Sequence, residues 1–162
     1  MTNRKLRSAL RSPLFALVLV AVFAGTAVAT TASGFVGTVL SRVTMSEPVH
    51  FNTGAVKFQT KAAVDVATAT VNVIPGGTSG WHTHPGIVIV SVKSGSITFY
   101  DQTCAGTVHA AGTAFVEAAG DGPGKAVNAS ATDPAVLYVT YVVPTGAALR
   151  IDVPIDEAPP GC

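Results

Sequence analysis

Charged residues are scarce in this sequence: they make up 12% of its 162 residues, against about 25% in an average soluble domain. The 10 basic and 9 acidic residues leave a net charge of +1. Four of the basic residues lie within residues 1–13, so six basic and nine acidic residues remain beyond them, a net charge of about −3. Because no basic patch is left to meet a phosphate backbone, we expect no nucleic-acid partner.

Several catalytic motifs are also absent from the sequence. It contains no Gly-x-Ser-x-Gly elbow, no glycine-rich phosphate loop leading into a helix, and no Cys-x-x-Cys redox pair. The acidic residues give no pattern that predicts paired carboxylates flanking a cleft. These absences argue against the usual serine hydrolases, nucleotide-binding folds and dithiol oxidoreductases.

Long apolar runs are missing except at the N-terminus. Residues 1–13 carry four basic residues and no acid, and an apolar run follows from Leu14 to an Ala-Val-Ala sequence that ends at Ala29. This layout predicts a secretory signal peptide over residues 1–29 and a secreted, extracytoplasmic protein. An uncleaved anchor is the alternative, and it is the only arrangement in which we expect membrane contact. A span needs about 20 mostly apolar residues, whereas polar residues follow Ala29.

Cysteine is limited to Cys104 and Cys162. An even number of cysteines in an exported chain predicts a disulfide between them. Closing a loop of this length would stabilise the fold by about 4 kcal/mol in the chain-entropy model. Two free thiols in a reducing compartment are the alternative.

No segment after residue 29 shows a 3.6-residue apolar repeat with capping residues, so we expect no helix there. Short stretches that alternate β-branched with small or polar residues predict strands instead. Glycine and proline clusters separate them as turns, residues 101–111 are expected to form a loop, and residues 96–100 should pair back on the preceding strand as a hairpin. Many short strands of this kind predict an all-β sandwich or barrel. The predicted strands cover residues 38–43, 63–74, 80–84, 87–92, 96–100, 113–117, 125–129, 135–143 and 148–153.

The most concentrated polar pattern is His82-Thr-His84, preceded by Trp81. Residues two apart on a strand point to the same face, so the two imidazoles should lie side by side. Neutral imidazoles are ligands for Zn, Mn, Fe, Ni and Cu. Trp81 should point to the other face and pack there.

This region resembles the first motif of the cupin superfamily, which runs Gly, five residues, His-x-His, three or four residues, Glu, six residues, Gly. Gly76, His82, His84 and Gly95 stand at matching positions, and the stretch Gly112–Glu117 is also similar to small exported bacterial cupins.

The resemblance implies a cupin barrel, the double-stranded β-helix or jelly roll, over residues 50–162. Residues 1–29 would then be the signal peptide and residues 30–49 an N-terminal lead-in. The resemblance also implies a homodimer joined through edge strands of the barrel.

Two positions depart from the family's pattern. The glutamate ligand of the first motif would fall at Val88, which cannot bind a metal. The histidine of the second motif should stand four residues before Asn128, where this chain has Gly124. We therefore expect both Val88 and Asn128 to lie at the pocket without serving as ligands.

The resemblance leaves His82 and His84 as metal ligands, with Glu117 and His109 as the candidates to complete the set. Two histidines alone would hold a divalent metal weakly, because protein sites usually supply three or four ligands.

Three functions remain open. The first is an exported barrel that binds a small molecule, with or without a weakly held divalent metal at His82 and His84. The second is a metal-dependent cupin enzyme of the oxygenase or isomerase type, and the third is a structural protein of the cell envelope. The incomplete ligand set favours the first.

Overall fold

The computed structural model describes residues 29–118 and 120–161, which form strands joined by turns and loops and contain no helix. The predicted all-β class is confirmed. Residues 1–28 lie outside this range, so the signal peptide stays a prediction. Over the described part of the chain, nothing has the length and apolarity of a membrane-spanning helix.

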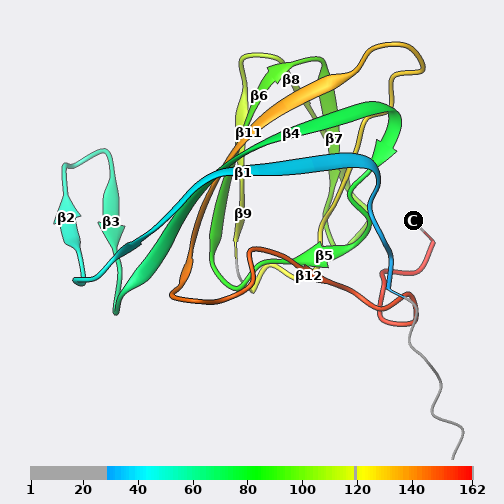
Figure 1. Ribbon diagram of the computed structural model, residues 1–162. Coiled ribbons are helices and arrows are strands. Elements are labelled where there is room, and N and C mark those ends of the chain that lie inside the picture. The colour runs from blue at the N-terminus through cyan, green and yellow to red at the C-terminus, as the bar shows by residue number, and fades with distance from the viewer. Residues whose placement is uncertain (1–28, 119, 162) are drawn as a thin grey trace, which may run out of the picture.

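Twelve strands are formed within the described residues (Figure 1). They are β1 (Ser33–Met45), β2 (His50–Asn52), β3 (Lys57–Gln59), β4 (Val64–Thr78), β5 (His82–Thr83), β6 (Ile87–Ser94), β7 (Ser96–Tyr100), β8 (Gly106–Ala110), β9 (Ala114–Ala118), β10 (Lys125–Val127), β11 (Ala135–Pro144) and β12 (Ile151–Asp152).

The main sheet has the strand order β8-β7-β10-β4-β11-β6-β9, and β1 pairs with β4 as well. All of these pairs are antiparallel, and the sheet curls into a nearly closed barrel (Figure 1). A short second sheet joins β5 to β12 and closes one end of the barrel beside His82.

Alternation along β4 explains how the barrel fills its interior. Ala67, Ala69, Val71 and Val73 are buried, while the residues between them point to the opposite face of the sheet and are more exposed. Each fully buried valine or leucine contributes about 1.5–3 kcal/mol, and the core consists mainly of such residues from β4, β6 and β11. Because these side chains are small, the interior is left partly open near β5.

Asp65 ties three segments together at the other end of β4. Its carboxylate accepts hydrogen bonds from Arg42 and Thr44 of β1 and from the backbone N–H of Gly146. The Gly146 bond is the largest influence, and with those of Thr44 and Arg42 it lowers the pKa of this carboxyl to about 2. The ionised Asp65 therefore links β1, β4 and the loop after β11 through its hydrogen bonds.

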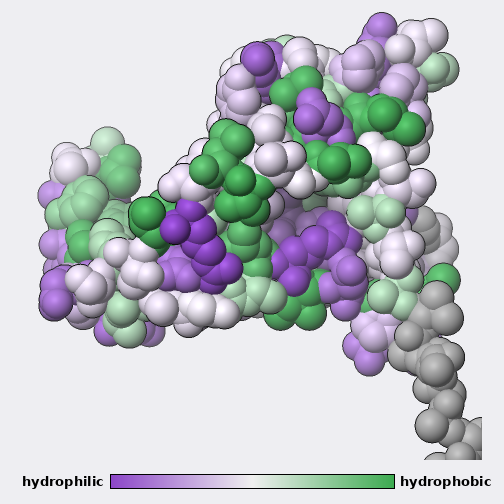
Figure 2. All heavy atoms as spheres, viewed as in Figure 1, coloured by the Kyte–Doolittle hydropathy of each residue, from purple (hydrophilic) through white to green (hydrophobic). Residues whose placement is uncertain are grey.

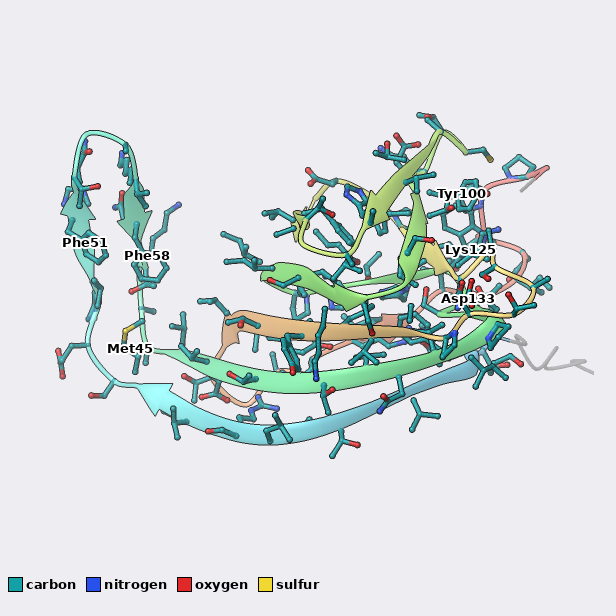
Figure 3. All side chains as sticks on the ribbon, turned by 90° about the horizontal axis from the view of Figure 1, so that it is seen from above. Met45, Phe51, Phe58, Tyr100, Lys125 and Asp133 are labelled. Atoms are coloured by element: carbon teal, nitrogen blue, oxygen red, sulfur yellow. The ribbon has the colours of Figure 1, made fainter. Side chains whose placement is uncertain are left out.

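The hairpin of β2 and β3 projects away from the barrel (Figures 1 and 3). The rings of Phe51 and Phe58 lie on its two strands with their centroids 5.6 Å apart.

Several predicted strand boundaries are wrong. β1 covers 13 residues where the sequence predicted six, because it pairs with β4 along almost its whole length. β4 continues through the turn predicted at residues 75–77, and β8 lies within the predicted loop of residues 101–111. Residues 80–84 were predicted as one strand, but β5 keeps only two of them.

The predicted hairpin between residues 87–92 and 96–100 is also wrong. β6 pairs with β9 and β11, whereas β7 pairs with β8 and β10. Gly95 marks the corner between these two groups of strands. Its φ is +73°, and a Cβ there would lie 2.6 Å from the carbonyl oxygen of Pro134, so glycine is required.

Candidate metal site

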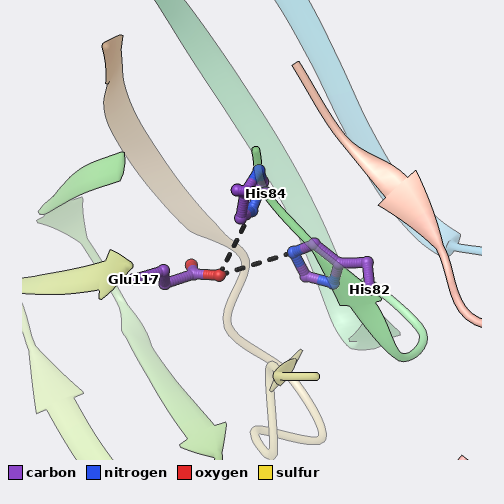
Figure 4. A group of neighbouring side chains, drawn as sticks. All are labelled: His82, His84 and Glu117. Carbon is purple, nitrogen blue, oxygen red and sulfur yellow. Dashed lines mark ion pairs between the residues drawn. The ribbon is translucent and has the colours of Figure 1, made fainter. Parts of the chain in front are cut away.

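Three side chains from two separate parts of the chain converge at one end of the barrel (Figure 4). His82 lies in β5, His84 follows it two residues later, and Glu117 lies in β9. The Nε2 atom of His82 is 3.5 Å from Oε2 of Glu117, and that of His84 is 3.3 Å from the same oxygen. The ligand atoms of the three residues all lie within 4.8 Å of one another, so this group could hold a metal ion.

The pairing of β6 with β9 explains why Glu117 reaches the histidines. Val88 and Glu117 are directly opposite in this pair. Opposite residues of antiparallel strands point to the same face, with Cβ atoms about 4.5–5.5 Å apart. The carboxylate is therefore presented from the strand next to the one on which the cupin motif would place it.

Gly124 stands where the second cupin motif would supply a histidine. Its backbone N–H donates to the carbonyl of His82 at 2.9 Å, and the N–H of His82 donates to the carbonyl of Gly124 at 3.0 Å. A side chain at this position would run into the Phe99 ring, which fills the space. The position next to His82 is thus structural.

The Nδ1 atoms of His82 and His84 both lie within hydrogen-bonding distance of backbone carbonyls. Nδ1 of His82 lies 3.0 Å from the carbonyl oxygen of Gly80, and Nδ1 of His84 lies 2.6 Å from that of Leu149. Because a carbonyl oxygen only accepts, each Nδ1 carries the proton. In the neutral form, each Nε2 therefore directs a lone pair toward Glu117.

Glu117 is ionised at neutral pH. Burial alone raises the pKa of its carboxyl, but when His82 and His84 are protonated their hydrogen bonds and positive charges outweigh burial and lower the pKa to about 2. If the imidazoles are neutral instead, the carboxylate faces two nitrogen lone pairs, and a positive charge is needed between them. Either protons on the imidazoles or a metal ion can supply it.

The distance from His84 to Glu117 fits a shared metal ion better than a direct hydrogen bond, and the distance from His82 to Glu117 is slightly longer than such a site needs. Charge-assisted N–H···O bonds are usually about 2.7–2.9 Å long, shorter than the 3.3 and 3.5 Å found here. Neighbouring ligand atoms bound to one ion at about 2.0–2.1 Å lie about 2.8–3.4 Å apart. Two imidazole nitrogens and one carboxylate oxygen are donors that zinc, manganese, iron, nickel and copper accept in proteins.

A cavity of about 160 Å³ lies next to the three residues. For comparison, an apolar cavity of about 150 Å³ accommodates a benzene molecule. Figure 2 shows a hollow in the face that β1 crosses, with hydrophilic residues along its lower rim. Most of the cavity wall is apolar and comes from Phe35, Val71, Val88, Val90, Phe115, Leu137 and Val139.

Tyr141 and Arg150 add polar groups to this wall. The Tyr141 ring lies 5.8 Å from that of His84, and burial together with the negative Glu117 raises the pKa of its hydroxyl. Sequence reasoning missed both residues. Alternation along residues 135–143 could have placed Tyr141 inside, and Arg150 is the single arginine beyond Arg42.

A second, smaller pocket lies against the same three residues. It measures about 50 Å³ and is also lined by Phe99, Asp101, Asp121 and Gly124. His82, His84 and Glu117 border both spaces, so the group forms part of the wall between them.

The other predicted site residues lie outside the His-His-Glu group. His109 lies in β8 and stacks on Phe115 with ring centroids 4.1 Å apart, outside the converging group. Val88 lines the cavity and is 1% exposed. Asn128 is fully buried, and its amide donates to the carbonyls of Ile74 and Asp133, so it shapes a loop.

Trp81 is buried, which confirms that it packs. The Nζ atom of Lys125 lies 4.8 Å from the Trp81 ring centroid. It also lies 5.3 Å from the ring centroid of Tyr100 (Figure 3). The favourable interaction of an ammonium with an aromatic face helps to hold β10 beside this segment.

Cys104 lies in the loop between β7 and β8, with its Sγ 3.7 Å from the carbonyl oxygen of Pro160. The C-terminal segment therefore passes close to this cysteine. Cys162 lies outside the described residues, so their disulfide stays a prediction. The intact mass before and after reduction would test it.

No protein-family model matches the sequence, and no curated protein matches it. Solved structures do. The polyketide cyclase RemF from Streptomyces resistomycificus matches with a TM-score of 0.54 and 16% identity, over 81% of this chain and 79% of RemF. A Klebsiella pneumoniae protein with a double-stranded β-helix domain matches at 0.48 and 20%, over 67% and 86%. A Bordetella pertussis cupin domain matches at 0.46 and 18%, over 67% and 93%.

The protein therefore has the cupin fold, a double-stranded β-helix, as its sequence predicted. Within that fold it carries a His-His-Glu group beside a mostly apolar cavity. Identities this low extend to the fold and not to the chemistry of the site.

Proposed function

We propose that the protein binds one divalent transition metal through His82, His84 and Glu117 and presents it to a small organic molecule in the barrel cavity. The observation that carries this proposal is the convergence of three acceptor atoms, poorly exposed to water, on one point. Without a cation, their negative charge and lone pairs would repel one another. A metal ion would relieve that repulsion.

Three protein ligands leave coordination positions open, as is usual where a metal acts on a substrate. Two histidines and one carboxylate with open positions are the arrangement of non-haem iron oxygenases. The cavity next to the group would supply the molecule that fills those positions. A metal-dependent cupin enzyme acting on a small molecule is thus favoured over a structural protein, and we propose that it acts outside the cytoplasm.

A metal-free binding pocket is the second candidate. The observation in its favour is that protonated imidazoles could themselves pair with Glu117 at 3.3 and 3.5 Å. In that case the same cavity would bind an organic molecule through its polar side chains alone.

Metal content separates the two candidates. The protein is purified without a polyhistidine tag, dialysed, and measured by elemental analysis beside the Glu117→Gln and His84→Ala variants. His109→Ala is the matched control, because it removes a histidine of the same barrel from outside the group. We expect about one metal per chain in the wild type and the control, and a large loss in the other two variants.

Wild-type protein that contains no metal and gains no stability from Zn, Mn, Fe, Ni or Cu would overturn the proposal. A metal present at 100 times its dissociation constant should stabilise the fold by about 2.7 kcal/mol, so thermal unfolding would detect even a weak site.

A further inference from the structure

The cavity is lined mostly by apolar side chains, but its wall also contains Arg150, which is permanently charged. We propose that Arg150 recognises a carboxylate on the molecule that binds in the cavity, and that the ligands of this protein are small monocarboxylates with a compact apolar body. This inference rests on the proposed metal site and names the class of molecule that the site takes.

Arg150 lies in the loop between β11 and β12, directly after Leu149. The carbonyl of Leu149 holds the Nδ1 proton of His84, so adjacent residues of one loop position a metal ligand and the arginine. Among the described residues that line the cavity, Arg150 is the one side chain with a permanent positive charge.

The guanidinium is held in place and still has donors to offer. Its Nε donates to Asp152 at 2.5 Å, and one terminal nitrogen donates to the carbonyl of Ser79. These bonds use two of the five N–H donors of an arginine, which leaves three. A planar carboxylate is the anion that such a fork binds best, through two parallel hydrogen bonds.

Charge balance favours a monoanion when the metal is bound. A divalent ion with neutral His82 and His84 and the negative Glu117 leaves one positive charge. Asp152 offsets the charge of Arg150, but its side chain is 42% exposed, so water screens that pairing. One carboxylate would neutralise the metal centre while hydrogen bonding to Arg150.

The apolar wall sets the rest of the ligand. Valine, leucine and phenylalanine side chains offer no hydrogen bonds, so a polar body would lose its contacts with water on entry. The volume of about 160 Å³ limits that body to roughly the size of a benzene ring. Benzoate meets both conditions, and benzamide has nearly the same shape without the charge.

The test is calorimetric titration of metal-loaded protein with benzoate and with benzamide. We expect the wild type to bind benzoate at least about tenfold more tightly than benzamide. Arg150→Gln should weaken benzoate binding by about 10- to 100-fold and leave benzamide binding unchanged. Lys57→Gln is the matched control, because it removes one positive charge from an exposed position on β3, and it should change neither affinity.

Metal content is measured on every sample, which separates this inference from the proposed function. Metal-loaded wild type that binds benzamide as tightly as benzoate, or binds neither at millimolar concentration, overturns the role of Arg150 and leaves the metal site standing. If Arg150→Gln loses its metal or its fold, Arg150→Lys keeps the charge. If Arg150→Lys keeps the wild-type affinity for benzoate, the charge of Arg150 has a role in binding. If Arg150→Lys loses affinity for benzoate and benzamide to the same extent, carboxylate recognition is refuted.

Wild type without metal overturns the proposed function instead. The role of Arg150 is then decided on the metal-free protein. If the metal-free wild type binds benzoate and Arg150→Gln does not, Arg150 still recognises the carboxylate. If the metal-free wild type does not bind benzoate, that role is overturned.

Discussion

The carboxylate of Glu117 should be transferable to the strand beside it. In the variant Val88→Glu/Glu117→Val, the two side chains exchange places across the β6–β9 pair. Their Cβ atoms should lie about 4.5–5.5 Å apart on the same face, a distance that a glutamate side chain can span. The exchanged carboxylate would then reach His82 and His84 from the position on which the cupin motif places it.

The expected magnitudes follow from the number of ligands. Loss of a group that only orients a ligand usually weakens metal binding by about 10–100-fold. Glu117→Val removes a ligand itself, so we expect a loss of more than about 100-fold. Val88→Glu alone would place two carboxylates side by side in a site poorly exposed to water, and their repulsion should lower the thermal midpoint of the metal-free protein.

The assay is competition for Zn²⁺ or Mn²⁺ against a chromogenic chelator, with thermal unfolding as a check on the fold. The exchanged variant should recover at least a tenth of the wild-type affinity, whereas Glu117→Val should not. An exchanged variant that folds but binds metal no better than Glu117→Val would refute the equivalence of the two positions. Full metal binding by Glu117→Val would show that this residue is not a ligand.

Three further predictions follow from contacts described above. Asp65→Asn should lower the thermal midpoint at neutral pH. Because the folded pKa of about 2 lies below the ordinary 3.8, the stabilising effect of Asp65 is complete above pH 3.8 and is lost as the pH falls toward 2. The difference in thermal midpoint between wild type and Asp65→Asn should therefore become smaller over this range. A difference that stays constant would argue against a stabilising role of the ionised carboxylate. Trp81 is the single tryptophan and stands next to the proposed ligand His82 in the sequence. Cu²⁺ should therefore quench the tryptophan fluorescence of the wild type but not that of His82→Ala. Gly124→His should not tighten metal binding by itself because Phe99 fills the space, whereas Gly124→His with Phe99→Ala should. Equal affinities in both variants would contradict that explanation.

The fold was predictable because its signals are local. Alternation of valine with small or polar residues identified β4, β6 and β11, and the His-x-His spacing indicated the cupin barrel. The errors lie where pairing depends on distant partners. β1 extends along β4 beyond its own alternation, and Gly95 turns the chain out of one group of strands rather than back along the same strand.

The site was only half predictable for the same reason. His82 and His84 stand two residues apart, so strand periodicity alone brings them together. Glu117 could be proposed but not placed, because its position depends on the register between β6 and β9. No sequence motif indicated Arg150, because it stands 66 residues after His84 and reaches the cavity only through the folding of a loop.

The contacts of β5 also determine when the site can form during folding. β5 carries His82 and pairs with β12, the carbonyl of Leu149 holds His84, and the backbone of Val153 bonds to both Thr30 and Trp81. A nascent chain that ends before these last residues already contains all three proposed ligands but lacks the parts that hold two of them in place. Metal acquisition should therefore follow completion and closure of the barrel, so an unfinished or C-terminally clipped chain would not retain the ion.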